Sequence, residues 1–376
     1  MIARDFDAIE RSDLEALVAN QVAERRTLEF KRDLPGTSES ARKEFLADVS
    51  SFANAQGGDL IYGIEEQRGV ASALVGLELD DPDREILRWE EILLSGIEPR
   101  MPGARLRWID LAEGRGALLI RIPASTIAPH RVILARSNRF FGRKSNGKYE
   151  LDTQELRDAF TASEALPNRL RALHLDAVDR ASRGELPIFL GDEPKAILSL
   201  IPVTVFRDAR DLDITPENAL APHKPSGYMD AIRMIDGVLL HTNPGERGAV
   251  RSYAVTHRQG RTDMAWTIGG VVNELRRDEM RVVWPQRFEE GVIDAALSGA
   301  IRLAPFGIEG PWLVLVTVTG IRNHHLVLPD RHMSQPAWLS EVTLPALTVE
   351  RMSRPALNPI LRAFWLAFGE QRPPAE

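Results

Sequence analysis

Acidic side chains and a lysine occur near the N-terminus in a pattern that suits metal-dependent chemistry on phosphate esters. Glu29 and Lys31 alternate within residues 27–31, so a strand there would place both on one face. Glu65 and Glu66 lie at the end of the next predicted strand. Converging carboxylates are hard oxygen ligands for Mg²⁺ or Mn²⁺, and such a metal activates bound water. A nearby ammonium orients that water or balances charge.

A basic segment follows about sixty residues later. Residues 129–149 contain no acidic residue, and their basic side chains are Arg131, Arg136, Arg139, Arg143, Lys144 and Lys148. These side chains can neutralise several phosphates. A solvated, arginine-rich hairpin explains the segment equally well, and the net charge of −7 gives no global argument for nucleic acid. His130 opens the segment as a further phosphate contact, with a satisfied loop histidine as the alternative.

Periodicity predicts the elements that position these residues in a first domain spanning 1–165. Apolar residues recur at helical spacing over 5–20 and, most clearly, over 42–55, where Gly57 and Gly58 are expected to cap the helix. Leu28 and Phe30 are expected to face the core. Strands are predicted at 27–31, 60–64, 105–110, 117–122 and 139–143, and a helix over 153–160 closes the domain.

The second half has mixed signals that predict another α+β domain over 186–369, after a linker helix over 166–185. We expect strands at 196–206 and 312–320, a hairpin around 258–261 and an amphipathic helix over 288–303. The proline-containing tail, 370–376, is predicted to be disordered. The fold class is therefore α/β in the broad sense, with an α+β arrangement in both domains.

Composition limits the possible functions. The chain has no cysteine, which excludes disulfides, thiolate zinc sites and cysteine nucleophiles. No stretch has the roughly 18 apolar residues of a membrane helix, and the acidic N-terminus is unlike a secretory signal. We therefore expect a cytoplasmic protein with no membrane partner.

The order of motifs over residues ~10–160 resembles the Schlafen-type AlbA domain family, in a bacterial member. The resemblance lies in Glu24 followed by Glu29-Phe-Lys31, in Phe52-Ala-Asn with Gly57-Gly58, and in Gly63-Ile with two acids. The segments Pro129-His130, 139–143 and 153–156 also fit. The second domain is similar to C-terminal extensions of bacterial members.

The resemblance implies a nucleic-acid-binding domain and a three-carboxylate metal site at Glu24, Glu29 and Glu66, with Lys31 as a further catalytic residue. The family's third acid is usually Asp, so Glu66 is a departure that bears on catalysis. Glu24 can join Glu29 only if Arg25 and Arg26 form a turn or bulge. Alternatively, Glu24 caps a turn, Glu29 pairs with Lys31, and the other acids are solvated.

The function implied by the family is a metal-dependent endoribonuclease acting on structured RNA such as tRNA, with RNA favoured over DNA and a role in antiphage defence. The alternative is a non-catalytic nucleic-acid-binding regulator or defence subunit, whose C-terminal domain engages a protein partner. Vertebrate Schlafens pair two copies of this domain around a groove. Because this chain holds one copy, the resemblance implies a homodimer.

Two other motifs are weaker. Residues 142–148 imitate a phosphate-binding P-loop, but Tyr149 stands where Ser or Thr would bind Mg²⁺, so ATP binding has little support. His324 and His325 lack further ligands at zinc spacing.

Overall fold

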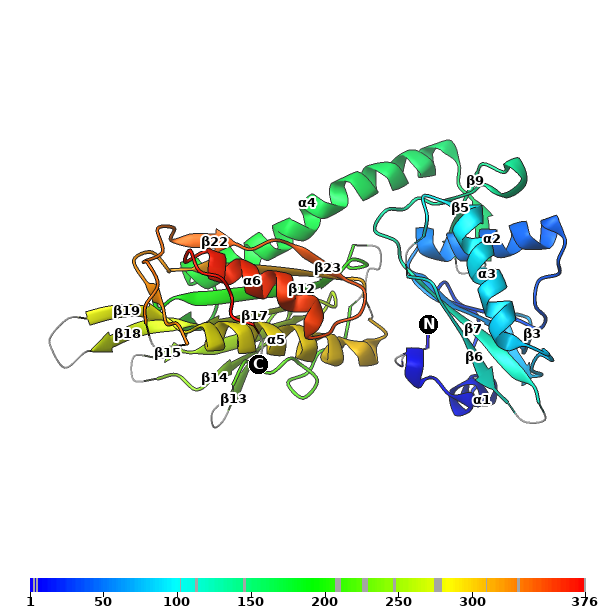
Figure 1. Ribbon diagram of the computed structural model, residues 1–376. Coiled ribbons are helices and arrows are strands. Elements are labelled where there is room, and N and C mark those ends of the chain that lie inside the picture. The colour runs from blue at the N-terminus through cyan, green and yellow to red at the C-terminus, as the bar shows by residue number, and fades with distance from the viewer. Residues whose placement is uncertain are drawn as a thin grey trace. The chain divides into compact units, whose positions relative to one another are not determined.

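The computed structural model describes residues 1–376 except 3, 5, 102, 112–113, 145–146, 207–210, 225–228, 246–247, 274–278, 309, 330–331 and 375–376. It contains two compact units, the N-terminal unit built on Met1–Pro167 and the C-terminal unit on Asn168–Val205 and most of the following chain (Figure 1). Both combine helices with sheets, so the expected α+β class is confirmed.

The N-terminal unit contains two four-stranded sheets, ordered β1-β2-β7-β6 and β10-β9-β8-β5, and the hairpin β3-β4. Its elements are η1 (Phe6–Ala8), α1 (Arg11–Ala19), β1 (Leu28–Lys31), α2 (Glu39–Asn54), β2 (Gly57–Tyr62), β3 (Ile64–Gln67), β4 (Val70–Leu74), α3 (Pro82–Gly96), β5 (Ile97–Glu98), β6 (Arg105–Asp110), β7 (Gly116–Pro123), β8 (Arg131–Val132), η2 (Leu134–Arg136), β9 (Arg139–Lys144) and β10 (Gly147–Glu150).

The strand β1 presents two chemically different faces. It runs parallel to β2, and Leu28 and Phe30 are buried in the cluster that packs under α1, as expected from the alternation. Glu29 and Lys31 lie opposite Leu60 and Tyr62, whose side chains belong to the cluster under α2. The acid and the lysine therefore face α2.

The predicted helix over 42–55 is α2, which begins three residues earlier because Ser38 caps it by accepting the Ala41 N–H. The expected glycine cap is wrong, since Gly57 and Gly58 belong to β2. A Cβ at Gly58 would lie 2.5 Å from Phe52 Cε1, so the second glycine allows the strand to pack closely on the helix.

Two other predicted elements are interrupted. The strand expected over 60–64 breaks at Gly63, whose φ of +99° separates β2 from β3. Glu65 and Glu66 therefore lie within the β3-β4 hairpin, at a register shift, rather than at a strand end. The helix expected over 5–20 is divided into η1 and α1, and its first residue lies outside the described residues.

One helix replaces two predicted ones. The helices expected over 153–160 and 166–185 are parts of α4 (Thr153–Arg183), which continues through Pro167. A proline inside a helix removes one backbone hydrogen bond and disfavours its continuation, so the two segments are expected to be separate. The division between the two units still falls at this proline.

The C-terminal unit is built on a large antiparallel sheet ordered β13-β14-β16-β17-β12-β20-β22, with β23 also pairing β20. Its elements are β11 (Phe189–Leu190), β12 (Lys195–Pro202), β13 (Met229–Arg233), β14 (Gly237–Thr242), β15 (Ala249–Val250), β16 (Ser252–His257), β17 (Thr262–Thr267), β18 (Gly269–Asn273), β19 (Glu279–Val283), α5 (Pro285–Leu303), η3 (Ala304–Phe306), β20 (Trp312–Thr319), β21 (His325–Leu326), β22 (Glu341–Thr343), β23 (Leu347–Val349), η4 (Pro355–Leu357) and α6 (Asn358–Leu366).

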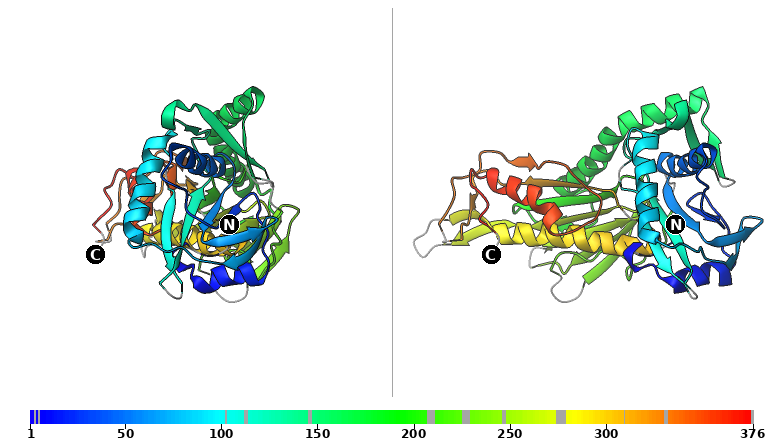
Figure 2. Two further views of the ribbon diagram at one scale, coloured as in Figure 1. Left: turned by 90° about the vertical axis from the view of Figure 1, so that its right-hand side faces the viewer. Right: turned by 45° about the vertical axis from the view of Figure 1, so that its right-hand side comes forward.

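Helices cover both faces of this sheet. α5 and α6 pack on one face around Trp266 and Phe288, and Figure 2 shows them alongside the strands. The C-terminal part of α4 packs on the other face through Ala177, Val178 and Ala181. The predicted strand at 312–320, the 258–261 hairpin and the 288–303 helix are confirmed as β20, β16-β17 and α5. The strand expected over 196–206 ends earlier, at Pro202.

The predictions of no membrane helix and of a disordered C-terminal tail can also be compared with the structure. No described helix is long and apolar enough to cross a bilayer. In the tail, residues 371–374 have no regular secondary structure, and Arg372 forms an ion pair with Glu289 at 2.7 Å.

Candidate functional site

The centre of the candidate site is the carboxylate of Glu29, which two cations hold. Lys31 Nζ lies 2.5 Å from Glu29 Oε1, and Arg143 Nη2 lies 2.5 Å from Glu29 Oε2. The Arg143 guanidinium also lies 3.8 Å from the centre of the Phe52 ring. β1, α2 and β9 therefore meet at this carboxylate, and Glu29 and Arg143 are both buried.

A second carboxylate that the sequence analysis missed lies beside the first. Asp48 on α2 is buried, and Lys148 Nζ lies 2.5 Å from its Oδ1 while also pairing with Glu44. A signal for Asp48 exists in the sequence, because it is an acid within the apolar stripe between Phe45 and Phe52. An acid on the buried face of a helix requires a partner.

The protonation of this cluster follows from burial and charge. Burial raises the pKa of Asp48, and the charge of Glu29 raises it further. Lys148 only partly offsets these two effects, so the pKa of Asp48 reaches about 6. Burial also acts to raise the pKa of Glu29, but the charges of Arg143 and Lys31 outweigh it and hold this pKa below its ordinary value. Glu29 therefore loses its proton at a lower pH than Asp48.

The other two predicted carboxylates, Glu24 and Glu66, each accept a backbone N–H group. Residues 25–28 form the expected turn, closed by mutual backbone hydrogen bonds between Arg25 and Leu28. Glu24 Oε1 accepts the Phe30 N–H at 2.8 Å, and Glu66 Oε2 accepts the Gly69 N–H at 2.5 Å. Burial raises the pKa of Glu24, and the charges of Glu29 and Glu66 add to this shift.

The described carboxylates do not fit a resident metal ion in this arrangement. Among the described residues, no three histidine, aspartate or glutamate side chains gather as ligands of one ion. Both oxygens of Glu29 contact cations, whereas Glu24 and Glu66 each accept a backbone N–H. Divalent metals need carboxylate oxygens directed at a shared point.

The basic segment divides into inward-facing and outward-facing side chains. Arg143 and Lys148 are opposite each other in the β9-β10 register, and both point toward α2 and its neighbouring acids. His130 is fully buried, with Nδ1 2.7 Å from the Pro99 carbonyl oxygen. The expectation that His130 and Arg143 contact phosphates is therefore corrected, because neither side chain reaches the surface.

The remaining basic side chains reach solvent. Arg136 is exposed, whereas Arg131 forms an ion pair with Glu98, Arg139 with Glu150 and Lys144 with Glu155, in pairs that are at least a third exposed. Arg26, which was expected only as part of a turn, is also exposed. Arg143 Nε donates to the Arg26 carbonyl oxygen at 3.1 Å, and this hydrogen bond joins the turn to β9.

The two weaker motifs have structural explanations. Residues 142–148 belong to the β9-β10 hairpin, with 145 and 146 outside the described residues, and no helix starts at Lys148 as a P-loop requires. His324 and His325 each place Nδ1 near a backbone carbonyl oxygen, at 3.0 and 2.8 Å.

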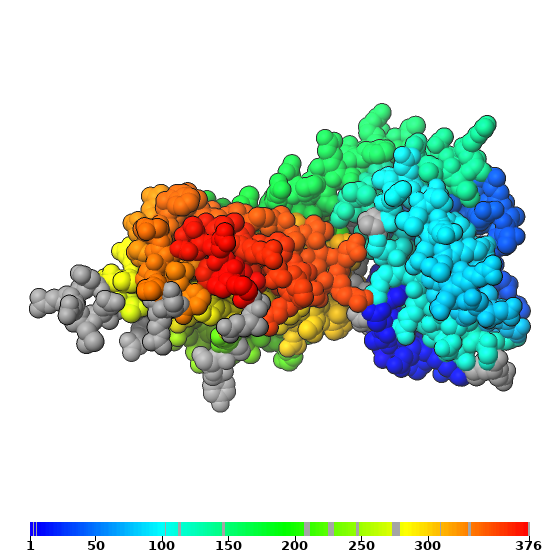
Figure 3. Space-filling model, viewed as in Figure 1, coloured from blue at the N-terminus to red at the C-terminus, as the bar shows by residue number. Residues whose placement is uncertain are grey.

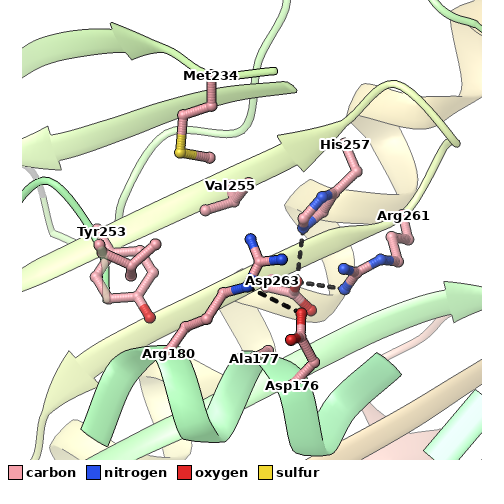
Figure 4. A pocket seen from close by; sticks show the side chains of 10 residues that line it. Asp176, Ala177, Arg180, Met234, Tyr253, Val255, His257, Arg261 and Asp263 are labelled. Carbon is pink, nitrogen blue, oxygen red and sulfur yellow. Dashed lines mark hydrogen bonds and ion pairs between the residues drawn. The ribbon is translucent and has the colours of Figure 1, made fainter. Parts of the chain in front are cut away.

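A separate polar cluster is buried in the C-terminal unit, where His257 and Arg261 converge on Asp263 (Figure 4). The Ser199 hydroxyl donates to Asp263 at 2.5 Å, so the Nδ1–H of His174 donates to Ser199. The adjoining cavity measures about 10 Å³, room for about one water molecule. This network therefore ties α4 to the sheet.

Comparisons with known proteins agree with the family resemblance. Residues 24–152 match the family model described as Schlafen, AlbA_2. This match confirms the resemblance and implies a nucleic-acid-binding or nuclease-like role for the N-terminal unit. No curated protein matches the chain.

Two solved structures are similar to parts of the chain. The DIP2311 protein from Corynebacterium diphtheriae is 21% identical, with a TM-score of 0.28, over 40% of this chain and 27% of that one. The N-terminal domain of a protein from Nitrosomonas europaea, described as related to the ATP-dependent DNA helicase RecG, is 22% identical, with a TM-score of 0.24, over 31% of this chain and 74% of that one. The chain thus spans about a quarter of the Corynebacterium protein's length.

Proposed function

Since residues 24–152 match the Schlafen AlbA_2 family, we propose that the N-terminal unit binds nucleic acid, with RNA favoured over DNA, and does so without a metal. The observation that carries the proposal is the hydrogen bond from Arg143 Nε to the Arg26 carbonyl oxygen, which joins the 25–28 turn, with its exposed arginine Arg26, to the strand β9 that carries Lys144 and Arg139. We name this surface the basic rim and define it by Arg26, Lys144 and Arg139.

The ion pairs at the basic rim are weak enough for phosphates to displace the acids. Lys144 Nζ lies 3.9 Å from Glu155, and the Arg139–Glu150 pair is more than half exposed on both sides. Exposed pairs of this kind contribute about 0–1 kcal/mol. A phosphate backbone offers these cations several anions at once and releases its own counterions on binding.

The buried cluster has a supporting role in this proposal. Glu29 holds Arg143, and Asp48 holds Lys148, so the inward face of the hairpin is fixed against β1 and α2. A fixed hairpin keeps Lys144 and Arg139 in place and lowers the entropy that binding must overcome.

The test is binding of a fluorescently labelled tRNA, measured by anisotropy at several salt concentrations. A variant carrying both Arg26→Glu and Lys144→Glu is compared with a control carrying Lys43→Glu, which reverses one charge on α2. We expect binding to weaken at least tenfold in the double variant. The slope of the logarithm of the binding constant against the logarithm of the salt concentration should become shallower by about one for each phosphate that is no longer neutralised. Equal affinities in the two variants would remove the basic rim from the proposal.

A second candidate is the metal-dependent endoribonuclease acting on structured RNA such as tRNA, with a role in antiphage defence. One observation favours it: the charges of Glu29 and Glu66 both act on Glu24, so these three carboxylates lie within electrostatic reach of one another. For this function Glu29 would have to leave Lys31 and Arg143, and Mg²⁺ or Mn²⁺ would have to take their place.

The oligomeric state belongs to the proposal as well. We propose a homodimer that presents two basic rims to one nucleic acid, and a protein partner for the C-terminal unit. Light scattering at micromolar concentration tests the first part, because a monodisperse monomer would contradict it.

A further inference from the structure

The outward face of the β9-β10 hairpin carries aromatic side chains. Tyr149 lies opposite Gly142 in the register, on the face away from Arg143 and Lys148. A Cβ at Gly142 would lie 3.0 Å from Tyr149 Cζ, so the glycine lets the tyrosine ring pack against the strand. Phe140 lies on the same strand two residues before this glycine and therefore shares its face.

A helix brings a third ring to this face. Phe160 on α4 contacts Phe140 edge to face, with ring centroids 6.0 Å apart and planes at 76°. Phe160 is 53% exposed, and it is the most exposed aromatic ring among the described residues of the N-terminal unit. Figure 1 shows α4 beginning beside the hairpin.

A cation lies next to one of these rings. Lys144 Nζ lies 4.0 Å from the centre of the Tyr149 ring, and its side chain is 62% exposed. Arg139, directly before Phe140, is 64% exposed on the opposite face of β9. Nucleobases stack on aromatic rings while cations contact the adjacent phosphates, and this combination is the basis of single-strand recognition.

We propose that Phe160 is a stacking platform for an unpaired base, so that the preferred ligand of the basic rim is single-stranded nucleic acid. This inference rests on the proposed function. Bases in a duplex have both faces covered by their neighbours, so a surface ring cannot stack on them. The basic rim alone would contact single strands and duplexes through phosphates only.

The experiment compares a labelled 12-nucleotide single-stranded RNA with its duplex. Binding is measured for the wild type, Phe160→Ala, Phe160→Trp and the control Phe189→Ala, which removes a ring of similar exposure, 48%, in the C-terminal unit. We expect Phe160→Ala to weaken single-strand binding about tenfold and to leave duplex binding within twofold. Phe160→Trp retains affinity, and the single strand quenches its added fluorescence. Circular dichroism checks that each variant is folded.

The outcomes separate this inference from the proposed function. If the wild type binds neither RNA, the proposed function fails and the platform fails with it. If the wild type binds the single strand and Phe160→Ala binds it equally, the platform is overturned while the basic rim stands. If Phe160→Ala weakens the binding of both RNAs equally, or changes only the oligomeric mass of the protein, the ring has another role and the inference is overturned.

Discussion

Arg143 Nη2 lies 2.5 Å from Glu29 Oε2, and both side chains are buried between β1, β9 and α2. The sequence pattern assigns these residues to two different tasks, a metal ligand and a phosphate contact. In the folded chain each is the other's partner. This ion pair therefore stabilises the packing of β9 against β1 and α2.

Replacing Arg143 tests the structural weight of this ion pair. We expect Arg143→Ala to lower the free energy of unfolding by about 3 kcal/mol, because a buried carboxylate is left with only one of its two cations. Arg139→Ala, at an exposed ion pair on the same strand, should change it by less than about 0.5 kcal/mol. Urea denaturation measures both. The combined variant Glu29→Gln with Arg143→Ala should cost less than the sum of the single changes, and strict additivity would contradict the pairing.

Asp48 predicts a pH dependence of stability. Its pKa rises from an ordinary 3.8 to about 6 on folding, so the unfolded chain releases this proton more readily than the folded one. Stability is therefore lost as pH rises from about 4 to about 6. Relative to wild type, the free energy of unfolding of Asp48→Asn should rise by on the order of 2–3 kcal/mol across that interval. The measurement is the urea midpoint of both proteins between pH 4 and pH 7, and a constant difference between the two midpoints would contradict the prediction.

His174 predicts the opposite slope in the C-terminal unit. Burial lowers its pKa from 6.5 to about 4, so the folded chain resists protonation that the unfolded chain accepts. Stability is lost as pH falls from about 6.5 toward 4. His174→Gln keeps hydrogen-bonding capacity without titrating, so its stability relative to wild type should rise on acidification. The measurement is the thermal midpoint of both proteins at pH 7 and pH 5. The same difference between variant and wild type at both pH values would count against a neutral buried imidazole.

Removing an acid at the basic rim should strengthen RNA binding. Glu150 competes with phosphate for Arg139 in an exposed ion pair at 3.3 Å. Because such pairs contribute about 0–1 kcal/mol, Glu150→Gln should improve affinity up to about fivefold. Glu39→Gln removes a similar exposed acid that pairs with Lys43 on α2, and it serves as the control. Equal gains from both would indicate only the change in net charge.

A surface on α3 serves as a further reference for such experiments. Leu87 and Leu94 on this helix are exposed, and the helix lies on the face turned toward the viewer in Figure 3. Substitutions at these leucines leave the basic rim unchanged, so they should not alter RNA affinity.

Local patterns were sufficient for much of the fold. Alternation placed Leu28 and Phe30 in the core, and the apolar stripe located α2, because these periodicities follow directly from strand and helix geometry. Gly63 was less informative, since a glycine inside an apolar run does not reveal whether the strand continues. Pro167 does not mark a helix end, because tertiary packing can stabilise a helix that contains a proline.

The site was harder to predict because its contacts join distant segments. Nothing local pairs Glu29 with Arg143, or Lys148 with Asp48, since those ion pairs depend on β9 packing against α2. The burial of His130 also depends on a distant carbonyl group, that of Pro99. Asp48 could have been found from the sequence, as an acid on an apolar helix face that needs a cation.

The most direct test incubates the purified protein with total tRNA and with single-stranded DNA, in Mn²⁺, in Mg²⁺ and in EDTA, and follows binding and cleavage together. Glu29→Gln is the matched variant. The metal-free proposal predicts binding that EDTA leaves unchanged, with both nucleic acids intact. Cleavage that requires metal and disappears in Glu29→Gln would contradict it and establish the nuclease instead.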